Sequence, residues 1–423
     1  MKVYIETYGC ALNNADTALM KQVLIGKGHE IVDSMDEADV VIVNTCTVRL
    51  DTEQRIVKRL SRLKTQVGNG VKLIVAGCMV AAQPYTISKV VPEASLISPQ
   101  NVIRIHEAVE NDGRIVLLSG ERDTTWLAPL VEGSVTSIPI AEGCLGNCSF
   151  CITKIARRRL RSYRPELVVR VAKEAVRKGV FELDLTAQDT AAYGIDLGDI
   201  RLHDLVRMIT EEVKGNYMLR VGMANPDNLM PILDDFIDVL KHPNVFKYVH
   251  IPLQSGSDKV LKLMNRRYTY DQYRSLILEI RRKIPEVQIA TDVIVGHPGE
   301  DDEDFEDTLK ALEELMPDKV HVAQYTIRPR TKAASMRQVS DSVKKSRSIE
   351  VNRIVESIGK TVNSAYVGSK AWVMVTGRSF RGSPVGRTIN YKPVVISDLN
   401  TVGVSGYVKI TNSTFYDLRG YWV

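Results

Sequence analysis

The chain has 423 residues, of which 44% are hydrophobic and 25% charged, a composition typical of globular proteins and not of disordered or fibrous ones. This length exceeds that of one ordinary hydrophobic core and predicts two or three domains. The net charge of +5 is too small to indicate a nucleic-acid partner by itself. No apolar run reaches the ~18 residues of a membrane-spanning helix, and the first residues lack the apolar stretch of a secretory signal, so we expect no membrane partner and a cytoplasmic protein.

Residues 1–125 alternate short apolar strands with helical stretches and predict a parallel α/β domain. The expected strands cover 2–9, 39–45 and 72–77, and the expected helices cover 15–28 and 51–64. Parallel sheets bind ligands at the carboxyl ends of their strands. Cys10, Cys46 and Cys78 each come at or just past such an end. Unrelated buried thiols are the alternative, but the matching positions favour one shared site.

Residues 135–362 follow a polar connector and repeat a strand-then-helix unit about six times. The expected strands cover 137–143, 181–189, 217–226, 246–256, 287–299 and 319–329. This repetition predicts a barrel, or part of one, with its site at the carboxyl ends of the strands. An acidic stretch at 300–316 predicts a solvated helix whose early carboxylates suit the N-terminal dipole.

Polar residues at the ends of these strands are the candidates for holding a ligand. They are Gln188, Asp189, Arg220, Asn225, Gln254, Ser255, Thr291 and Asp292. Each has a structural alternative. Arg220 could pair with a carboxylate of the barrel, and Gln254 with Ser255 could close a turn.

Residues 366–423 predict a small β-barrel, because short strands at 371–377, 394–398 and 404–411 are broken by turn residues. This segment holds seven basic residues against two acidic ones, which equals the net charge of the whole chain, together with nine of the 26 aromatic residues. Basic residues interleaved with aromatics suit phosphate neutralisation and base stacking. The composition therefore predicts an RNA-binding module.

Cys144, Cys148 and Cys151 lie in a glycine-containing loop directly after the first strand of the predicted barrel. A structural zinc site is the simplest alternative, but zinc needs a fourth ligand, and the nearest histidines are His106 and His203. Three thiolates on a 4Fe–4S cluster leave one iron without a protein ligand, and that iron can bind a substrate. The missing fourth ligand therefore favours an iron–sulfur site.

With Phe150 before its last cysteine, this Cys-x3-Cys-x2-Cys pattern resembles the signature of radical S-adenosylmethionine enzymes. The whole chain resembles their methylthiotransferase branch, through ETYGC, NTCTVR, AGC, CLGNCSFC, IPLQSGSDKVLKLMNR and IVGHPGE. The resemblance implies an α/β protein with an N-terminal parallel α/β domain, a central partial (β/α)6 radical barrel and a C-terminal TRAM domain. His297 departs from the pattern, since bacterial relatives have an aromatic residue there, and we expect it to be structural.

The resemblance further implies two 4Fe–4S clusters and S-adenosylmethionine as cofactors. Cys144, Cys148 and Cys151 would hold the cluster whose open iron chelates S-adenosylmethionine, and the eight polar strand-end residues would hold its nucleoside. An electron from a donor of unknown identity would then release a 5′-deoxyadenosyl radical. Cys10, Cys46 and Cys78 would hold the second cluster, whose sulfur is methylated and transferred to carbon 2 of an adenine.

CITKIARRRLRSY and TAQDTAAYG resemble the archaeal and eukaryotic type, which acts on N6-threonylcarbamoyladenosine at position 37, in the tRNA anticodon loop. The carboxylate of that adduct suits an arginine partner, although the arginine run could also be a solvated patch. The expected RNA-binding residues are Arg157, Arg158, Arg159, Lys370, Arg378, Arg381, Arg387 and Lys392. Alternatives are methylthiolation of isopentenyladenosine or of a ribosomal protein aspartate, and a non-catalytic zinc RNA-binding module.

Overall fold

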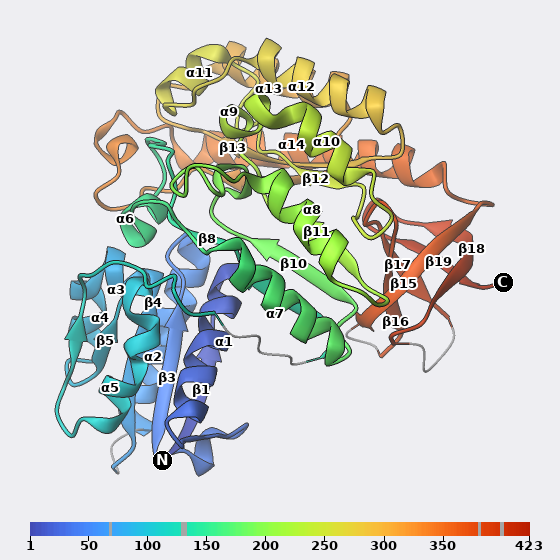
Figure 1. Ribbon diagram of the computed structural model, residues 1–423. Coiled ribbons are helices and arrows are strands. Elements are labelled where there is room, and N and C mark those ends of the chain that lie inside the picture. Colours follow the sequence, from blue (N-terminus) through green and yellow to red (C-terminus); the bar gives the residue numbers. More distant parts are fainter. Residues whose placement is uncertain (67–69, 128–132, 380–381, 398–401) are drawn as a thin grey trace.

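A computed structural model describes residues 1–66, 70–127, 133–379, 382–397 and 402–423 of the chain. The N-terminal α/β domain adjoins one end of the central barrel and the C-terminal barrel adjoins the other (Figure 1). The expected fold class, α/β with these three parts, is confirmed. None of the described helices is both long enough and apolar enough to cross a membrane.

The N-terminal domain is built on a parallel sheet with the strand order β2-β1-β3-β4-β5-β6. Its elements are β1 (Lys2–Thr7), α1 (Ala11–Gly26), β2 (Glu30–Ile31), η1 (Met35–Glu37), β3 (Val40–Thr45), α2 (Leu50–Gln66), β4 (Lys72–Gly77), α3 (Cys78–Ala82), α4 (Pro84–Val90), β5 (Ser95–Ile97), η2 (Pro99–Arg104), α5 (Ile105–Glu110) and β6 (Val116–Leu117). Helices cover both faces, and β3 is buried along its whole length. All three strands expected from the sequence are present.

The central domain has two parallel sheets, with the orders β11-β10-β7 and β12-β13-β14. Its strands are β7 (Val135–Pro139), β8 (Ala141–Glu142), β9 (Arg161–Ser162), β10 (Glu182–Thr186), β11 (Met218–Val221), β12 (Tyr248–His250), β13 (Gln288–Val295) and β14 (Lys319–Gln324). Leu219 of β11 bridges to Val245, just before β12, and thereby joins the two sheets into a partial barrel. The six expected strands all occur in this barrel, whose carboxyl ends lie toward the N-terminal domain (Figure 1).

The helices of this domain cover the outer side of the strands, apart from short ones such as α6 (Thr153–Arg157), which packs on α3 of the N-terminal domain. The others are α7 (Pro165–Arg177), η3 (Thr190–Ala192), α8 (Leu202–Glu212), α9 (Pro226–Leu229), η4 (Met230–Ile232), α10 (Leu233–Leu240), α11 (Asp258–Leu263), α12 (Tyr270–Lys283), α13 (Asp302–Leu315), η5 (Lys332–Ser335) and α14 (Asp341–Ser364). The acidic stretch forms α13, and Asp301 caps it by accepting from the backbone N–H of Asp304 at 3.0 Å. Leu183 and Leu185 of β10 pack in this outer core, so Glu182 and Asp184 face the barrel interior.

The C-terminal domain is a closed barrel with the order β15-β16-β17-β19-β18. Its strands are β15 (Lys370–Arg378), β16 (Pro384–Thr388), β17 (Pro393–Ile396), β18 (Ser405–Ser413) and β19 (Leu418–Trp422). Tyr391, from the β16–β17 turn, packs on Phe246 and Tyr248 with ring centroids 4.8 and 4.9 Å away, and it donates to Glu182 at 2.5 Å. This barrel therefore covers the N-terminal ends of the central strands, away from the cysteines.

Candidate functional site

Cys144, Cys148 and Cys151, called here the first triad, lie in the loop that follows β7 and β8. The backbone N–H of Gly146 donates to Cys144 Sγ at 3.2 Å. A Cβ added at Gly146 would lie 3.3 Å from Cys144 Sγ and 3.8 Å from Cys148 Sγ. The loop therefore curves closely around its own sulfurs, which suits a compact inorganic group.

Contacts from distant segments hold this loop in place. Ser149 donates its N–H to the carbonyl of Met264 at 2.9 Å and accepts from Ala333 N–H at 2.8 Å. Arg266 donates from Nη1 to Cys148 Sγ at 3.2 Å and from Nη2 to the side chain of Asn225 at 2.8 Å. Arg266 was not expected from the sequence, because a basic residue in a polar segment carries no signal of a sulfur partner.

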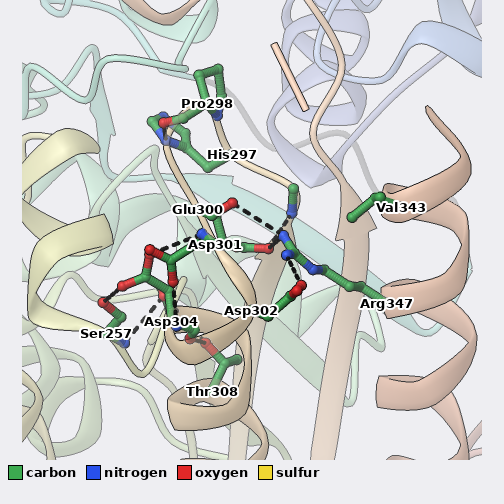
Figure 2. A network of polar contacts seen from close by, with 12 residues as sticks. Ser257, His297, Pro298, Glu300, Asp301, Asp302, Asp304, Thr308, Val343 and Arg347 are labelled. Carbon is green, nitrogen blue, oxygen red and sulfur yellow. Dashed lines mark hydrogen bonds and ion pairs between the residues drawn. The ribbon is translucent and has the colours of Figure 1, made fainter. Parts of the chain in front are cut away.

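The loop after β13 also supports the first triad, and Figure 2 shows this loop with Glu300 and Asp302 beside Arg347. His297 Nε2 lies 3.2 Å from the Ser149 hydroxyl, and burial lowers the pKa of this histidine to about 4, so it is neutral. Gly296 N–H donates to Glu300 at 2.8 Å, and Arg347 pairs with Glu300 and Asp302 at 2.7 Å each. The position of His297 is that of a packed, structural residue.

Cys10, Cys46 and Cys78, called here the second triad, follow the neighbouring strands β1, β3 and β4. The glycines that precede two of them, Gly9 and Gly77, have φ angles of +123° and +94°, a conformation that an L side chain rarely adopts. Burial raises the pKa of Cys78 to about 12, and Cys10 and Cys46 add in the same direction. The apo thiol of Cys78 is therefore protonated, and a bound metal would be needed to hold it as a thiolate.

A pair of short helices brings the two triads together. α6 starts two residues after Cys151 of the first triad, and α3 starts at Cys78 of the second. Cys78, Ala82, Ile152 and Ala156 pack in one apolar cluster between these helices. The two sites therefore lie on opposite sides of a single helix–helix contact.

A buried network of charged groups lies beside this contact. Arg157 donates from Nε to Cys78 Sγ at 3.2 Å, and its Nη1 pairs with Asp16 at 2.7 Å and Glu142 at 2.8 Å. Arg122 also pairs with Asp16, at 2.8 Å. Because Arg157 is 2% exposed, the surface RNA contact expected of it does not match its position.

Three of the expected S-adenosylmethionine residues lie around the first triad. Gln188 accepts from the backbone N–H of Gly143 at 2.6 Å. Asp189 is fully buried and accepts from the N–H of Asn225 at 2.9 Å. Asn225 in turn accepts from Arg266, which contacts Cys148. These side chains shape the wall of the cysteine loop.

The remaining candidates have different surroundings. Thr291 accepts from Leu253 N–H and Tyr273 hydroxyl, at 2.9 and 3.0 Å. Ser255 is buried and lies 3.2 Å from the Thr308 hydroxyl. Gln254 has a φ angle of +71°, and its buried Oε1 has no hydrogen-bond partner among the described residues. Gln254 is therefore the one of these three with an oxygen available to a ligand.

Arg220 and Asp292 line the interior of the barrel. Arg220 pairs with Asp184 at 3.3 Å, the structural alternative considered above, and Asp292 contacts His250 at 2.8 Å. Asp292, His250 and His321 could converge on one metal ion, since their ligand atoms lie within 4.8 Å of one another. Burial lowers the pKa of His321 to about 4, and the positive charges of Lys319 and Arg220 act in the same direction. The positive charges of Lys319 and Arg220 also disfavour binding of a metal cation at this site.

Three cavities adjoin these groups. One of about 570 Å³ is lined by Cys151 of the first triad and by Val48 and Arg49, close to Cys46 of the second. One of about 240 Å³ is lined by residues 157–159. One of about 450 Å³ lies between the central and C-terminal barrels.

The expected RNA-binding residues are distributed over several surfaces. Lys370 is exposed on β15, and Arg387 lines the 450 Å³ cavity. Lys392 is 3% exposed, with its ammonium 2.8 Å from Asp318, so its position is also not that of a surface RNA contact. Arg378 donates to the carbonyl of Gly382 at 3.0 Å. Arg381 lies outside the described residues.

Family models match each part of the chain. One described as the radical SAM superfamily covers residues 138–312, one described as uncharacterized protein family UPF0004 covers 2–98, and one described as the TRAM domain covers 364–423. The radical S-adenosylmethionine methyltransferase TsrM from Kitasatospora setae shares the fold, with a TM-score of 0.61 and 14% identity over 79% of this chain and 75% of that one. The barrel and its cysteine loop thus define a radical S-adenosylmethionine enzyme, a class that uses a 4Fe–4S cluster and S-adenosylmethionine.

Relatives that align over most of this chain identify the family within this class. A Methanocaldococcus jannaschii protein named "Probable threonylcarbamoyladenosine tRNA methylthiotransferase" is 40% identical over 99% of this chain and 96% of its own length. The Homo sapiens threonylcarbamoyladenosine tRNA methylthiotransferase is 35% identical over 90% of this chain and 66% of its own length. The chain belongs to the threonylcarbamoyladenosine tRNA methylthiotransferase family.

Proposed function

We propose that this chain converts N6-threonylcarbamoyladenosine at position 37 of tRNA to its 2-methylthio derivative. The observation that carries the proposal is the contact between α3 and α6, which places the first and second triads on either side of one interface. Two such sites at one interface suit a reaction in which sulfur held at one site meets a base activated at the other. Family membership favours this substrate over isopentenyladenosine or a protein aspartate.

The first triad would hold a 4Fe–4S cluster with one iron free of protein ligands. Together with S-adenosylmethionine, this group would supply reductive cleavage of the sulfonium bond, with one electron from an external donor, to give a 5′-deoxyadenosyl radical. The chain's own residues would position the cluster and S-adenosylmethionine. Arg266 donates to the sulfur of Cys148, and Gly146 leaves room for the cluster. Gln188, Asp189 and Asn225 shape the wall, and the free oxygen of Gln254 suits an amino or hydroxyl donor of the ligand.

The second triad would hold another 4Fe–4S cluster, the source of the transferred sulfur. Supporting this assignment are its position at three adjacent strand ends and the left-handed glycines Gly9 and Gly77, which let the backbone approach closely. The 570 Å³ cavity is lined by Cys151 of the first triad and by Val48, two residues after Cys46 of the second, and it is large enough for a nucleoside. It is the proposed place of the target adenine.

The threonylcarbamoyl carboxylate would be recognised by the arginines that directly follow α6. Arg158 and Arg159 line the 240 Å³ cavity, and within the part of the chain that the structure describes no carboxylate forms a salt bridge with Arg159. Replacing Arg159 with Gln should weaken binding of the modified tRNA by roughly tenfold or more, as expected for a lost charge-assisted hydrogen bond. Unmodified tRNA should bind with unchanged affinity, and an equal loss for both RNAs would exclude this role.

A second RNA contact is proposed at the far end of the barrel. Lys319 and Arg387 line the 450 Å³ cavity, and among the described residues neither forms a salt bridge with a carboxylate. Phe415 and Tyr416, 46% and 58% exposed, lie at the same cavity. Unpaired cations beside exposed aromatic rings suit a phosphate and a stacked base of single-stranded RNA.

Anaerobic purification followed by mass analysis of digested tRNA tests the proposed reaction. Two clusters predict about eight irons per chain. Replacing the second triad with Ala should halve the iron and abolish methylthiolation, while 5′-deoxyadenosine is still produced. If that variant still modifies tRNA, the assignment of the second triad is wrong. Stoichiometric zinc in place of iron would support a non-catalytic zinc module instead.

A further inference from the structure

We infer that Arg157 is a positioning residue for the methylthio transfer, fixing the charge at a sulfur of the second triad and the placement of that triad against the first. The inference rests on the proposed function, because it assumes a cluster on the second triad. It concerns a side chain that the sequence placed in an RNA-binding surface.

All three guanidinium nitrogens of Arg157 are used. Nε donates to Cys78 Sγ at 3.2 Å, Nη1 pairs with Asp16 at 2.7 Å and Glu142 at 2.8 Å, and Nη2 donates to Asn13 at 2.8 Å. Asn13, Asp16 and Cys78 belong to the N-terminal domain, whereas Glu142 belongs to the barrel. One planar group therefore fixes the angle between the two domains at the point where the triads face each other.

Stability alone does not account for this arrangement. A buried ion network costs desolvation of every charge and is often no more stable than apolar side chains of the same volume. Here two guanidinium groups, Arg122 and Arg157, balance two carboxylates, Asp16 and Glu142, inside the protein. Among the described residues, Arg157 is the charged group of this network that donates to a sulfur, whereas Arg122 donates to Tyr163, Pro99 and Asp16. The network therefore orients the Arg157 donor.

The physical consequence concerns the reduction potential at the second triad. Hydrogen bonds to cluster sulfurs and nearby positive charge both stabilise the reduced state and raise the potential. Removing the guanidinium should therefore lower the potential of a cluster held there and loosen the α3–α6 contact.

The test uses the full chain with the first triad replaced by Ala, so that only the second cluster contributes to the signal. Reconstituted protein is titrated potentiometrically and followed by electron paramagnetic resonance. Arg157→Met should shift the midpoint potential to a more negative value, and Arg157→Lys should shift it less because the charge remains. Arg122→Met is the matched control, since it opens the same network at Asp16 and Tyr163 but removes no sulfur contact. It should lower thermal stability and shift the potential less than Arg157→Met, because its charge does not contact a sulfur.

Glu142→Gln is a second variant, which tests the inference if Arg157→Met does not fold. This nearly isosteric change removes a negative charge that competes for Arg157, so the potential should become more positive. Equal potentials in all variants, or equal shifts for Arg157→Met and Arg122→Met, would show that Arg157 is only a structural clamp. Failure of the proposed function has a different result, because the parent with the first triad replaced would then contain no iron–sulfur signal.

Discussion

Replacing both Lys319 and Arg387 with Gln should weaken tRNA binding and reduce its dependence on salt. The two cations line one cavity between the barrels, and neither is neutralised by a carboxylate of the described chain. Truncating the C-terminal barrel would be a poorer test, since Met374 and Tyr391 pack on Phe246 and the deletion would expose apolar surface of the central domain. The double substitution removes charge and leaves this packing in place.

The size of the effect follows from the number of contacts. Each phosphate contact to single-stranded RNA contributes about 0.7 to the slope of log affinity against log salt, so two lost contacts reduce the slope by about 1.4. When salt rises fourfold, from about 50 to about 200 mM, the unaltered chain should therefore lose about sevenfold more affinity than the variant. Fluorescence anisotropy with a full tRNA transcript, measured at several salt concentrations, provides both slopes.

A matched control removes the same charge elsewhere. Lys241, directly after α10, and Lys310, on α13, are exposed and each lies near an aspartate, and neither lines the cavity. Lys241→Gln with Lys310→Gln should leave the slope unchanged. Equal slopes for both double variants would refute the cavity as an RNA contact. β13, with its eight residues, spans roughly 26 Å, so an RNA that contacts both ends of the barrel must extend at least that far.

Two further predictions concern the cysteine loop and the barrel interior. Gly146→Ala would place a methyl group 3.3 Å from Cys144 Sγ, so iron bound at the first triad should fall by roughly half or more while the far-UV circular dichroism stays unchanged. Burial raises the pKa of Asp184 from 3.8 to about 7, against the lowering effect of Arg220 and with Glu182 raising it further. The folded chain thus keeps a proton that the unfolded chain releases, and the free energy of unfolding falls as pH rises from 3.8 to about 7. Asp184→Asn should flatten this decline, seen as a smaller difference between melting temperatures at pH 5 and pH 7.5. If Asp184→Asn leaves the difference in melting temperature as large as in the unaltered chain, Asp184 is not the source of the pH dependence.

β1, β3 and β4 of the N-terminal domain and the six main barrel strands could be predicted because their apolar runs are long and bounded by turn residues. β2, β5, β6 and β9 were not expected, because strands of two or three residues are too short to show a period. In the C-terminal domain the strands at Lys370–Arg378 and Ser405–Ser413 were expected, whereas β16 and β19 carry Gly and Arg and have no clear alternation. The cysteines could be placed because each one follows a strand, and strand ends converge in a parallel sheet.

Partners that lie far along the chain could not be predicted. Arg157 belongs to a run of arginines, and such a run is typically solvated. It is buried because Asp16 lies on the first helix of another domain, 141 residues earlier in the numbering, and supplies a compensating charge. Lys392 is buried for the same reason, through Asp318 of the central domain. A local pattern cannot show a charge partner that only the tertiary fold brings near.

The short length of α6 has a consequence for how the reaction proceeds. The helix has five residues, so it is about 8 Å long, and it connects the last cysteine of the first triad to the arginine that contacts the second. No flexible linker intervenes, and α6 packs directly on α3, which begins at Cys78. The separation of the two triads is therefore fixed by local backbone geometry. On the proposed function, a base held in the cavity beside Cys151 would reach both sites without a swing of one domain relative to the other, and the rigid α3–α6 contact would be part of the catalytic arrangement.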